Sequence, residues 1–301
     1  ITFTSNSPTP SPGDWEGIIV RGTAKNLNHF IVDYASCGIV FRVSGNFTMR
    51  SCIFKLNLMA LSFEEPGSAT IEQTIFELNK VGINCLYARE GGFLDFKLIL
   101  NDVKFIGGSC AIRATELTLK NSIASEMETR GKVVLIHKAV IDNCIFSNNR
   151  GLSTSAWFIS GIRRYGIRGG AGSSVLINNS RIVDNFHFQS MVSLSGEARI
   201  YNTIISNNKG LEPPRYRADV VGGVKELTNC VITHNDGGVS ASEGAIIKDS
   251  VITYNGWGIR FYKNVTITQC IISNNMGVGV EGKGITIERC TIINNCGYGI
   301  H

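Results

Sequence analysis

The feature that most constrains the fold is a six-residue pattern that recurs every 20 residues in the C-terminal third. It begins at Cys230, Ser250, Cys270 and Cys290, and each copy ends in Asn. Apolar and polar residues alternate within each unit, as strands with one buried face require. Strands this short are unstable alone, but stacked units pair each strand with its copy in the next unit. The repeat therefore predicts a solenoid.

Copies of the pattern continue upstream, where insertions of different length separate them. They begin at Phe30, Cys52, Thr74, Cys144, Ser180 and Thr203, with weaker copies at Val103 and Ser122. No segment shows a run of helical periodicity. We therefore expect one all-β domain over residues 1–301, a right-handed parallel β-helix of about twelve coils.

The two ends of the sequence lack the polar capping units of natural solenoids. We expect the chain to be part of a longer chain or an assembly. Open β-helix ends expose unpaired backbone, which favours end-to-end self-assembly, so a filament subunit is one possible role.

Asparagine occupies the sixth position of most copies, and cysteine often occupies the first. The Asn column contains Asn57, Asn79, Asn149, Asn185, Asn208, Asn235, Asn255, Asn275 and Asn295. It favours a buried amide ladder over a row of ligand-binding amides. The Cys column contains Cys52, Cys144, Cys230, Cys270 and Cys290, and alternates with Ser and Thr, which predicts an inward site for small side chains. Cys270 and Cys290 lie within disulfide reach, but we expect stacked free thiols.

Two stretches resemble a known family. Pro12-Gly-Asp-Trp-Glu-Gly-Ile18 resembles the Pro-Gly-Asp-Trp-x-Gly-Ile opening strand of secreted bacterial and archaeal proteins with right-handed parallel β-helix repeats. The units Cys270–Val280 and Cys290–Ile300 resemble the repeats of that family and of the carbohydrate-binding and sugar-hydrolase β-helix group. The resemblance implies an extracellular or cell-surface location, with a polysaccharide or cell-surface glycan as partner. It leaves the activity open, because β-helices serve many functions.

Long insertions are the places where a solenoid most often carries function. We expect them at about residues 150–174 and 209–221. The candidate ligand-binding residues there are Trp157, Arg163, Arg164, Tyr165, Arg168, Arg215, Tyr216 and Arg217. Arginine pairs with carboxylate or sulfate, and aromatic rings offer flat faces to sugars, so these residues suit an acidic polysaccharide. Solvated loops without a ligand are the alternative.

Catalysis has only weak candidates in this sequence: Asp184, His187 and Asp219. Their spacing matches neither the facing carboxylates of glycosidases nor a calcium-binding Asp cluster. We expect no cofactor, metal site or membrane span, and the net charge of +5 does not imply nucleic acid. The leading hypothesis is a rigid structural or carbohydrate-binding module. The alternative is a lyase or hydrolase acting on an acidic polysaccharide.

Overall fold

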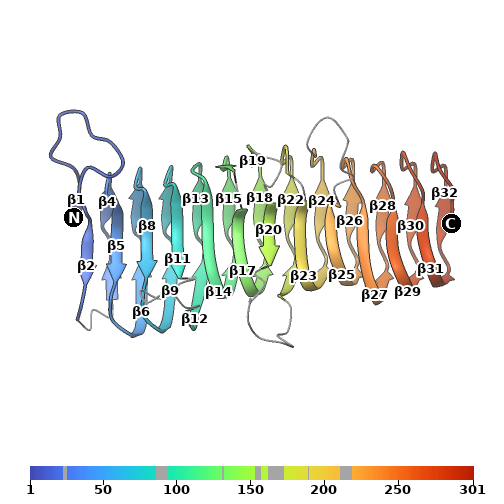
Figure 1. The fold of residues 1–301 in the computed structure, drawn as a ribbon, viewed down its shortest axis with the longest axis horizontal. Helices are drawn as coiled ribbons and strands as arrows, with labels where there is room; N and C mark the ends of the chain where they lie inside the picture. Colours follow the sequence, from blue (N-terminus) through green and yellow to red (C-terminus); the bar gives the residue numbers. More distant parts are fainter. Residues whose placement is uncertain are drawn as a thin grey trace.

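The computed structural model is a straight rod of stacked β-coils, with the two ends of the chain at opposite ends of the rod (Figure 1). It describes residues 1–22, 26–85, 94–130, 132–152, 157–161, 173–188, 190–210 and 219–301. Within these residues, the regular structure consists of β-strands, and every pairing between strands is parallel. The expected all-β parallel β-helix is confirmed.

Each coil presents three faces. The first face is a sheet of thirteen short strands, one for each coil, which agrees with the expectation of about twelve coils. Its strands are β1 (Thr2–Phe3), β4 (Ile31–Asp33), β7 (Ile53–Lys55), β10 (Ile75–Glu77), β13 (Lys104–Ile106), β15 (Ile123–Ser125), β18 (Ile145–Ser147), β22 (Arg181–Val183), β24 (Ile204–Ser206), β26 (Val231–Thr233), β28 (Val251–Thr253), β30 (Ile271–Ser273) and β32 (Thr291–Ile293).

The second and third faces belong to one sheet of seventeen strands that bends along its length. Strands of the second face alone are β2 (Ile18–Val20), β5 (Cys37–Phe41), β8 (Met59–Phe63), β11 (Val81–Cys85) and β20 (Trp157–Gly161). Strands of the third face alone are β3 (Asn26–Asn28), β6 (Gly45–Arg50), β9 (Gly67–Glu72), β12 (Phe96–Asn101) and β21 (Ser174–Asn178). Strands that span both faces are β14 (Cys110–Lys120), β17 (Lys132–Asp142), β23 (Ser190–Tyr201), β25 (Val221–Thr228), β27 (Val239–Lys248), β29 (Ile259–Thr268) and β31 (Val280–Glu288). A separate pair joins β16 (Glu128–Thr129) to β19 (Arg150–Gly151).

The alternation of apolar and polar residues places one side of each strand in the core. In β29, Ile259, Val265 and Ile267 are buried, whereas Tyr262 is 82% exposed. The register keeps apolar residues in line along the rod, so Ile259 pairs with Val239 of one neighbouring coil and Val280 of the other. Because the inward residues of successive coils stack directly, the core is a continuous column of aliphatic and aromatic side chains.

The predicted Asn column forms a ladder inside the bend between the first and second faces. Asn235 donates from Nδ2 to Asn255 Oδ1 at 2.9 Å and to the Ile205 carbonyl at 3.0 Å. The same contacts recur between Asn57 and Asn79 and again from Asn149 to Asn295, and the ladder is interrupted at the two coils whose sixth positions are Gly108 and Met127. A non-glycine residue with positive φ precedes each ladder residue in most coils, as Asn274 does at φ 55°. The ladder therefore satisfies the polar groups of a tight, buried corner.

The opening motif has a structural role at the first coil. Asp14 Oδ2 accepts hydrogen bonds from Ser5 Oγ at 2.8 Å and the Ser11 amide at 2.9 Å, which closes the preceding loop. Trp15 Nε1 donates to the Asp33 carbonyl at 2.8 Å. Gly17 has φ +106°, and a Cβ there would overlap the Cys37 carbonyl oxygen. These contacts explain the Asp, Trp and Gly of the motif without a ligand.

Candidate functional site

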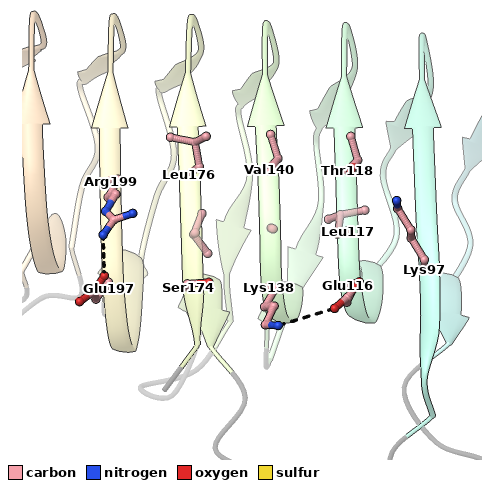
Figure 2. A pocket seen from close by; sticks show the side chains of 12 residues that line it. Lys97, Glu116, Leu117, Thr118, Lys138, Val140, Ser174, Leu176, Glu197 and Arg199 are labelled. Carbon is pink, nitrogen blue, oxygen red and sulfur yellow. Dashed lines mark hydrogen bonds and ion pairs between the residues drawn. The ribbon is translucent and has the colours of Figure 1, made fainter. Parts of the chain in front are cut away.

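A groove of about 310 Å³ runs along the third face, over strands β12, β14, β17, β21 and β23 (Figure 2). Its floor consists of outward side chains that the register places in one row: Thr118 pairs with Val140, and Val140 with Leu176. Val140 is 39% exposed. Between these residues, Leu117 and Val175 point into the core. The groove therefore has a partly apolar floor that is aligned with the rod axis.

Charged side chains form one margin of the groove. Lys97, Glu116, Lys138, Ser174 and Glu197 occupy the same outward position on successive coils. Lys138 Nζ lies 3.8 Å from Glu116 Oε1, and Arg199 Nη2 lies 3.1 Å from Glu197 Oε2. These pairs are exposed, so each contributes little to stability. Lys97 has no ion-pair partner among the described residues, which leaves a cation at one end of the groove.

A second amide ladder, on the surface, follows the corner between the third and first faces. Asn121 donates to Asn101 Oδ1 at 2.7 Å, and Asn143 donates to Asn121 Oδ1 at 2.8 Å. Further along, Asn202 donates to Asn178 Oδ1 at 2.9 Å and Asn229 to Asn202 Oδ1 at 2.7 Å. This ladder was not predicted from the sequence. Its signal is an Asn one or two residues before the first core position, as at Asn121 and Asn178.

Most of the predicted ligand-binding residues lie outside the described residues. These are Arg163, Arg164, Tyr165, Arg168, Arg215, Tyr216 and Arg217. Trp157 begins β20, whose backbone pairs with Lys132 and Ser190, but its side chain is not described. β19 and β20 both fall within the predicted insertion 150–174, and both stack in register on neighbouring coils. An arginine-lined and aromatic site in these loops stays a prediction.

The weak catalytic candidates lie in two successive coils. Asp184 and His187 flank ladder residue Asn185 in the bend after β22, both at positive φ. Asp219 lies in the next coil, two residues before β25. None of the described hydrogen bonds or ion pairs joins these three side chains. The described contacts therefore do not bring them together as a catalytic group.

Asp219 belongs to a different cluster, on the second face. Burial raises the pKa of its carboxyl to about 6, although the nearby Arg260 guanidinium opposes the shift. Arg260 also lies over the Trp257 ring, 4.6 Å from its centroid, and its Nε is 2.8 Å from Glu281 Oε2. Arg260 thus interacts with both carboxylates, Asp219 and Glu281. A carboxyl with a pKa this close to neutral can take up and release a proton near neutral pH, which is the property of a general acid or base.

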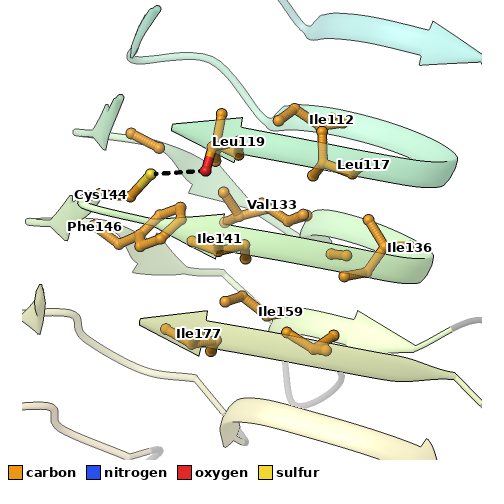
Figure 3. Close-up of a cluster of buried hydrophobic side chains, with 14 of the residues drawn as sticks. Ile112, Leu117, Leu119, Val133, Ile136, Ile141, Cys144, Phe146, Ile159 and Ile177 are labelled. Carbon is orange, nitrogen blue, oxygen red and sulfur yellow. Dashed lines mark hydrogen bonds between the residues drawn. The ribbon is translucent and has the colours of Figure 1, made fainter. Parts of the chain in front are cut away.

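The cysteine column is part of the core. Cys144, Cys230 and Cys270 are 1% exposed, and burial raises the pKa of each thiol to about 11. Figure 3 shows Cys144 among Leu119, Ile141 and Phe146, with its Sγ 3.5 Å from the Leu119 carbonyl oxygen. A thiol with a pKa this high stays protonated at neutral pH, so these residues pack the core as the sequence predicted and are poor nucleophiles.

A metal-binding cluster and a membrane-spanning helix are both absent from the described part of the chain. No three His, Cys, Asp or Glu side chains there are grouped closely enough to hold a metal ion. No helix of those residues has the length and apolarity that crossing a membrane requires.

Comparison with known proteins agrees with this architecture. The sequence profile of the family described as a right handed beta helix region matches residues 16–157 and 220–301. The chain belongs to this family. The right-handed β-helix that we expected from the repeat is therefore confirmed.

Other comparisons add little to the β-helix assignment. A search of curated proteins finds no match. Among solved structures, the chain is similar to the catalytic domain of a GH87 alpha-1,3-glucanase in complex with nigerose, with 11% sequence identity and a TM-score of 0.34. That alignment covers 97% of this chain and 67% of the glucanase chain. At this level, the similarity carries no argument about the activity of this β-helix.

Proposed function

We propose that the chain is a rigid carbohydrate-binding module, at the cell surface or outside the cell, that holds a linear polysaccharide in the groove of its third face. The groove itself is the observation that carries this proposal. It crosses five strands of a regular sheet, and strands in a sheet are about 4.8 Å apart, so it is about 20 Å long. A ligand that fills such a groove is extended and lies along the rod.

The lining of the groove suits sugars. Thr118, Val140 and Leu176 offer apolar contact to the C–H faces of sugar rings, and the polar side chains beside them can hydrogen-bond with hydroxyl groups. Ligand sites commonly combine a mostly apolar surface with a few placed polar groups. Lys97, which has no ion-pair partner among the described residues, supplies a cation for a uronate carboxylate. We therefore infer an acidic polysaccharide as the ligand, as the sequence analysis also suggested.

A substitution in the floor of the groove tests this proposal. Val140→Glu adds bulk and negative charge where the polymer would lie, and we expect at least a tenfold loss of affinity, which equals about 1.4 kcal/mol. Titration calorimetry with a panel of uronate-containing polysaccharides measures the effect. The matched control is Ile246→Glu, which changes an exposed residue in the same outward row, outside the groove. Equal losses in the two variants, or no binding by the parent, would contradict the proposal.

A lyase or hydrolase acting on acidic polysaccharide is the second candidate, and the raised pKa of Asp219 favours it. Incubation of the parent with the same panel, followed by assays for reducing ends and unsaturated uronate, tests it. New products that disappear in Asp219→Asn would establish an enzyme, whereas binding without products would leave a binding module. End-to-end assembly into filaments stays a prediction from the sequence.

A further inference from the structure

The first face carries an uncharged patch over its last five strands, β24, β26, β28, β30 and β32. The patch comprises the first and third residues of each strand, which lie on the outward side of the sheet, and the residue that follows the strand; among them Ser273 is buried and the others are exposed or half-buried. The first positions are Ile204, Val231, Val251, Ile271 and Thr291. The third position is Ser or Thr in the first four of these strands, and the following residue is Asn except at His234 and Tyr254. All of these positions lie within the described residues.

The absence of Asp, Glu, Lys and Arg from this patch is unusual for a protein surface. Surfaces typically contain about 25–35% charged residues. The corresponding positions nearer the N-terminus include Asp33, Lys55, Glu77, Lys104 and Arg181. The outward positions of the first face therefore tolerate charged residues, so the fold does not require them to be uncharged. The lack of charge in the last five coils needs another explanation.

The patch is also periodic and partly aromatic. Its strands pair in unbroken register, so each chemical group recurs about every 4.8 Å. The hydroxyl groups of Thr253 and Ser273 lie 3.2 Å apart. The rings of His234 and Tyr254 stack with centroids 5.0 Å apart, and Tyr254 is 53% exposed. Rows of methyl groups, hydroxyls and ring faces thus run side by side along the rod.

Size and charge decide between the possible occupants. The patch extends about 10 Å along each strand and four strand spacings, about 20 Å, along the rod, which gives about 200 Å². A stable dimer buries about 800 Å² on each partner, so the patch is too small to hold a second copy of this chain. A charged polymer would find no counter-charge. An ordered neutral polysaccharide presents C–H faces and hydroxyl groups at regular spacing, which matches the rows.

We propose that the uncharged patch binds the surface of an ordered, neutral polysaccharide. This site goes beyond the groove on the third face and does not depend on it, because the two surfaces lie on different faces of the rod and favour polymers of different charge. A chain that uses both sites would join a soluble acidic polymer to a neutral solid one.

Co-sedimentation with microcrystalline cellulose, crystalline chitin and an insoluble linear glucan tests the proposal. We expect the parent to sediment with at least one of these solids and to remain bound in high salt, because uncharged contacts are not screened. Ile271→Lys adds a charge at a position that is 46% exposed, and we expect at least a tenfold loss of bound protein. The matched control is Ile145→Lys, which changes a 39% exposed residue in the same outward row, outside the patch, and should bind as the parent does.

Further variants separate the possible explanations. Val231→Lys repeats the test at a second position if Ile271→Lys unfolds at a lower temperature than the parent. Val140→Glu, which changes the groove, should sediment normally. The proposal would be overturned if the parent sedimented with none of the three solids or if salt released it. It would also be overturned if Ile145→Lys lost as much binding as Ile271→Lys, or if Val140→Glu lost binding.

Discussion

Asn235 links three successive coils through one side chain. Its Oδ1 accepts hydrogen bonds from the amide and the Nδ2 of Asn208, at 3.0 and 2.9 Å, and its Nδ2 donates to Asn255 Oδ1. The residue is 2% exposed, so water cannot replace these partners. Each ladder residue therefore affects the hydrogen bonding of both neighbouring coils.

Removal of that side chain should be costly. We expect Asn235→Ala to lower the free energy of unfolding by about 2–3 kcal/mol, because it leaves the buried Asn208 amide without its acceptor and removes the hydrogen bonds to Asn255 Oδ1 and the Ile205 carbonyl. Denaturant unfolding measures the change. Asn46→Ala is the control: Asn46 is exposed and accepts one hydrogen bond, from Ser68, so its loss should change stability by no more than about 0.5 kcal/mol. If the two variants unfold alike, the ladder is not stabilising.

Asp219 should make stability depend on pH. Burial raises its pKa from 3.8 to about 6, so the folded chain holds a proton that the unfolded chain releases between about pH 4 and pH 6. Stability is therefore lost as the pH rises through this window. Asp219→Asn should be more stable than the parent above pH 6, by about 1–2 kcal/mol after allowance for partial exposure, and equal to it below pH 4. Thermal unfolding of the two proteins at several pH values measures the difference in stability. A difference between Asp219→Asn and the parent that is the same at pH 4 and pH 7 would contradict this.

Among the features of single residues, the columns of identical side chains were well predicted by the sequence. Asn275 and Cys270 recur at a fixed offset, and a parallel coil stacks residues of equal offset. The pKa of Asp219 was not predictable, because it depends on packing from other coils rather than on its own position. The surface amide ladder was missed for a related reason. The position that Asn121 and Asn202 occupy holds Asn in some coils but other residues elsewhere, such as Asp102 and Arg289, so no constant column marks it.

At the scale of elements, corners determine how one coil joins the next. Gly17 brings the chain into β2 with a positive φ, close against Cys37 of the following coil. A side chain at this point would displace β2 from β5, to which it pairs. The Gly of the opening motif is therefore required by backbone geometry.

Gly17→Ala should loosen the first coil and leave later coils intact. We expect a local cost of at least about 2 kcal/mol, from the unfavourable φ and the overlap with Cys37. Hydrogen exchange measures this as faster exchange of the β2 amides, with unchanged exchange in β29. Gly22→Ala is the control, since a Cβ there meets no atom within 4 Å. If the β2 amides of Gly17→Ala exchanged as slowly as those of the parent, the Gly of the motif would not be required by backbone geometry.

The short strands were predictable as elements, whereas the groove was not. Residues 250–295 repeat without insertion, so inward and outward positions can be counted from the sequence. Between Phe96 and Tyr201 the coils differ in length, and the outward row Thr118, Val140 and Leu176 has no fixed spacing. Only the strand register of the structure shows that these residues share one surface.

The whole molecule is a stack in which each coil contacts mainly its neighbours. Stability in such a solenoid is close to a sum over coils and the interfaces between them. A change on one face of one coil therefore has a local effect. For this reason the groove and the uncharged patch can be altered separately, and the variants proposed for each site serve as controls for the other.

The hydrogen bonds between coils also have a mechanical consequence, because they run along the rod. Ile271 N bonds to Ser250 O at 3.0 Å, and Thr291 N bonds to Cys270 O at 2.9 Å, so tension between the two ends acts on the coils in series. An outermost coil yields first, since it has a neighbour on one side only. Each coil of 20 residues then releases about 70 Å of extended chain, while the remaining rod keeps its shape. Under load, the coils between Cys230 and Cys290 would therefore lengthen the molecule in equal steps, whereas coils of other lengths upstream would give unequal ones.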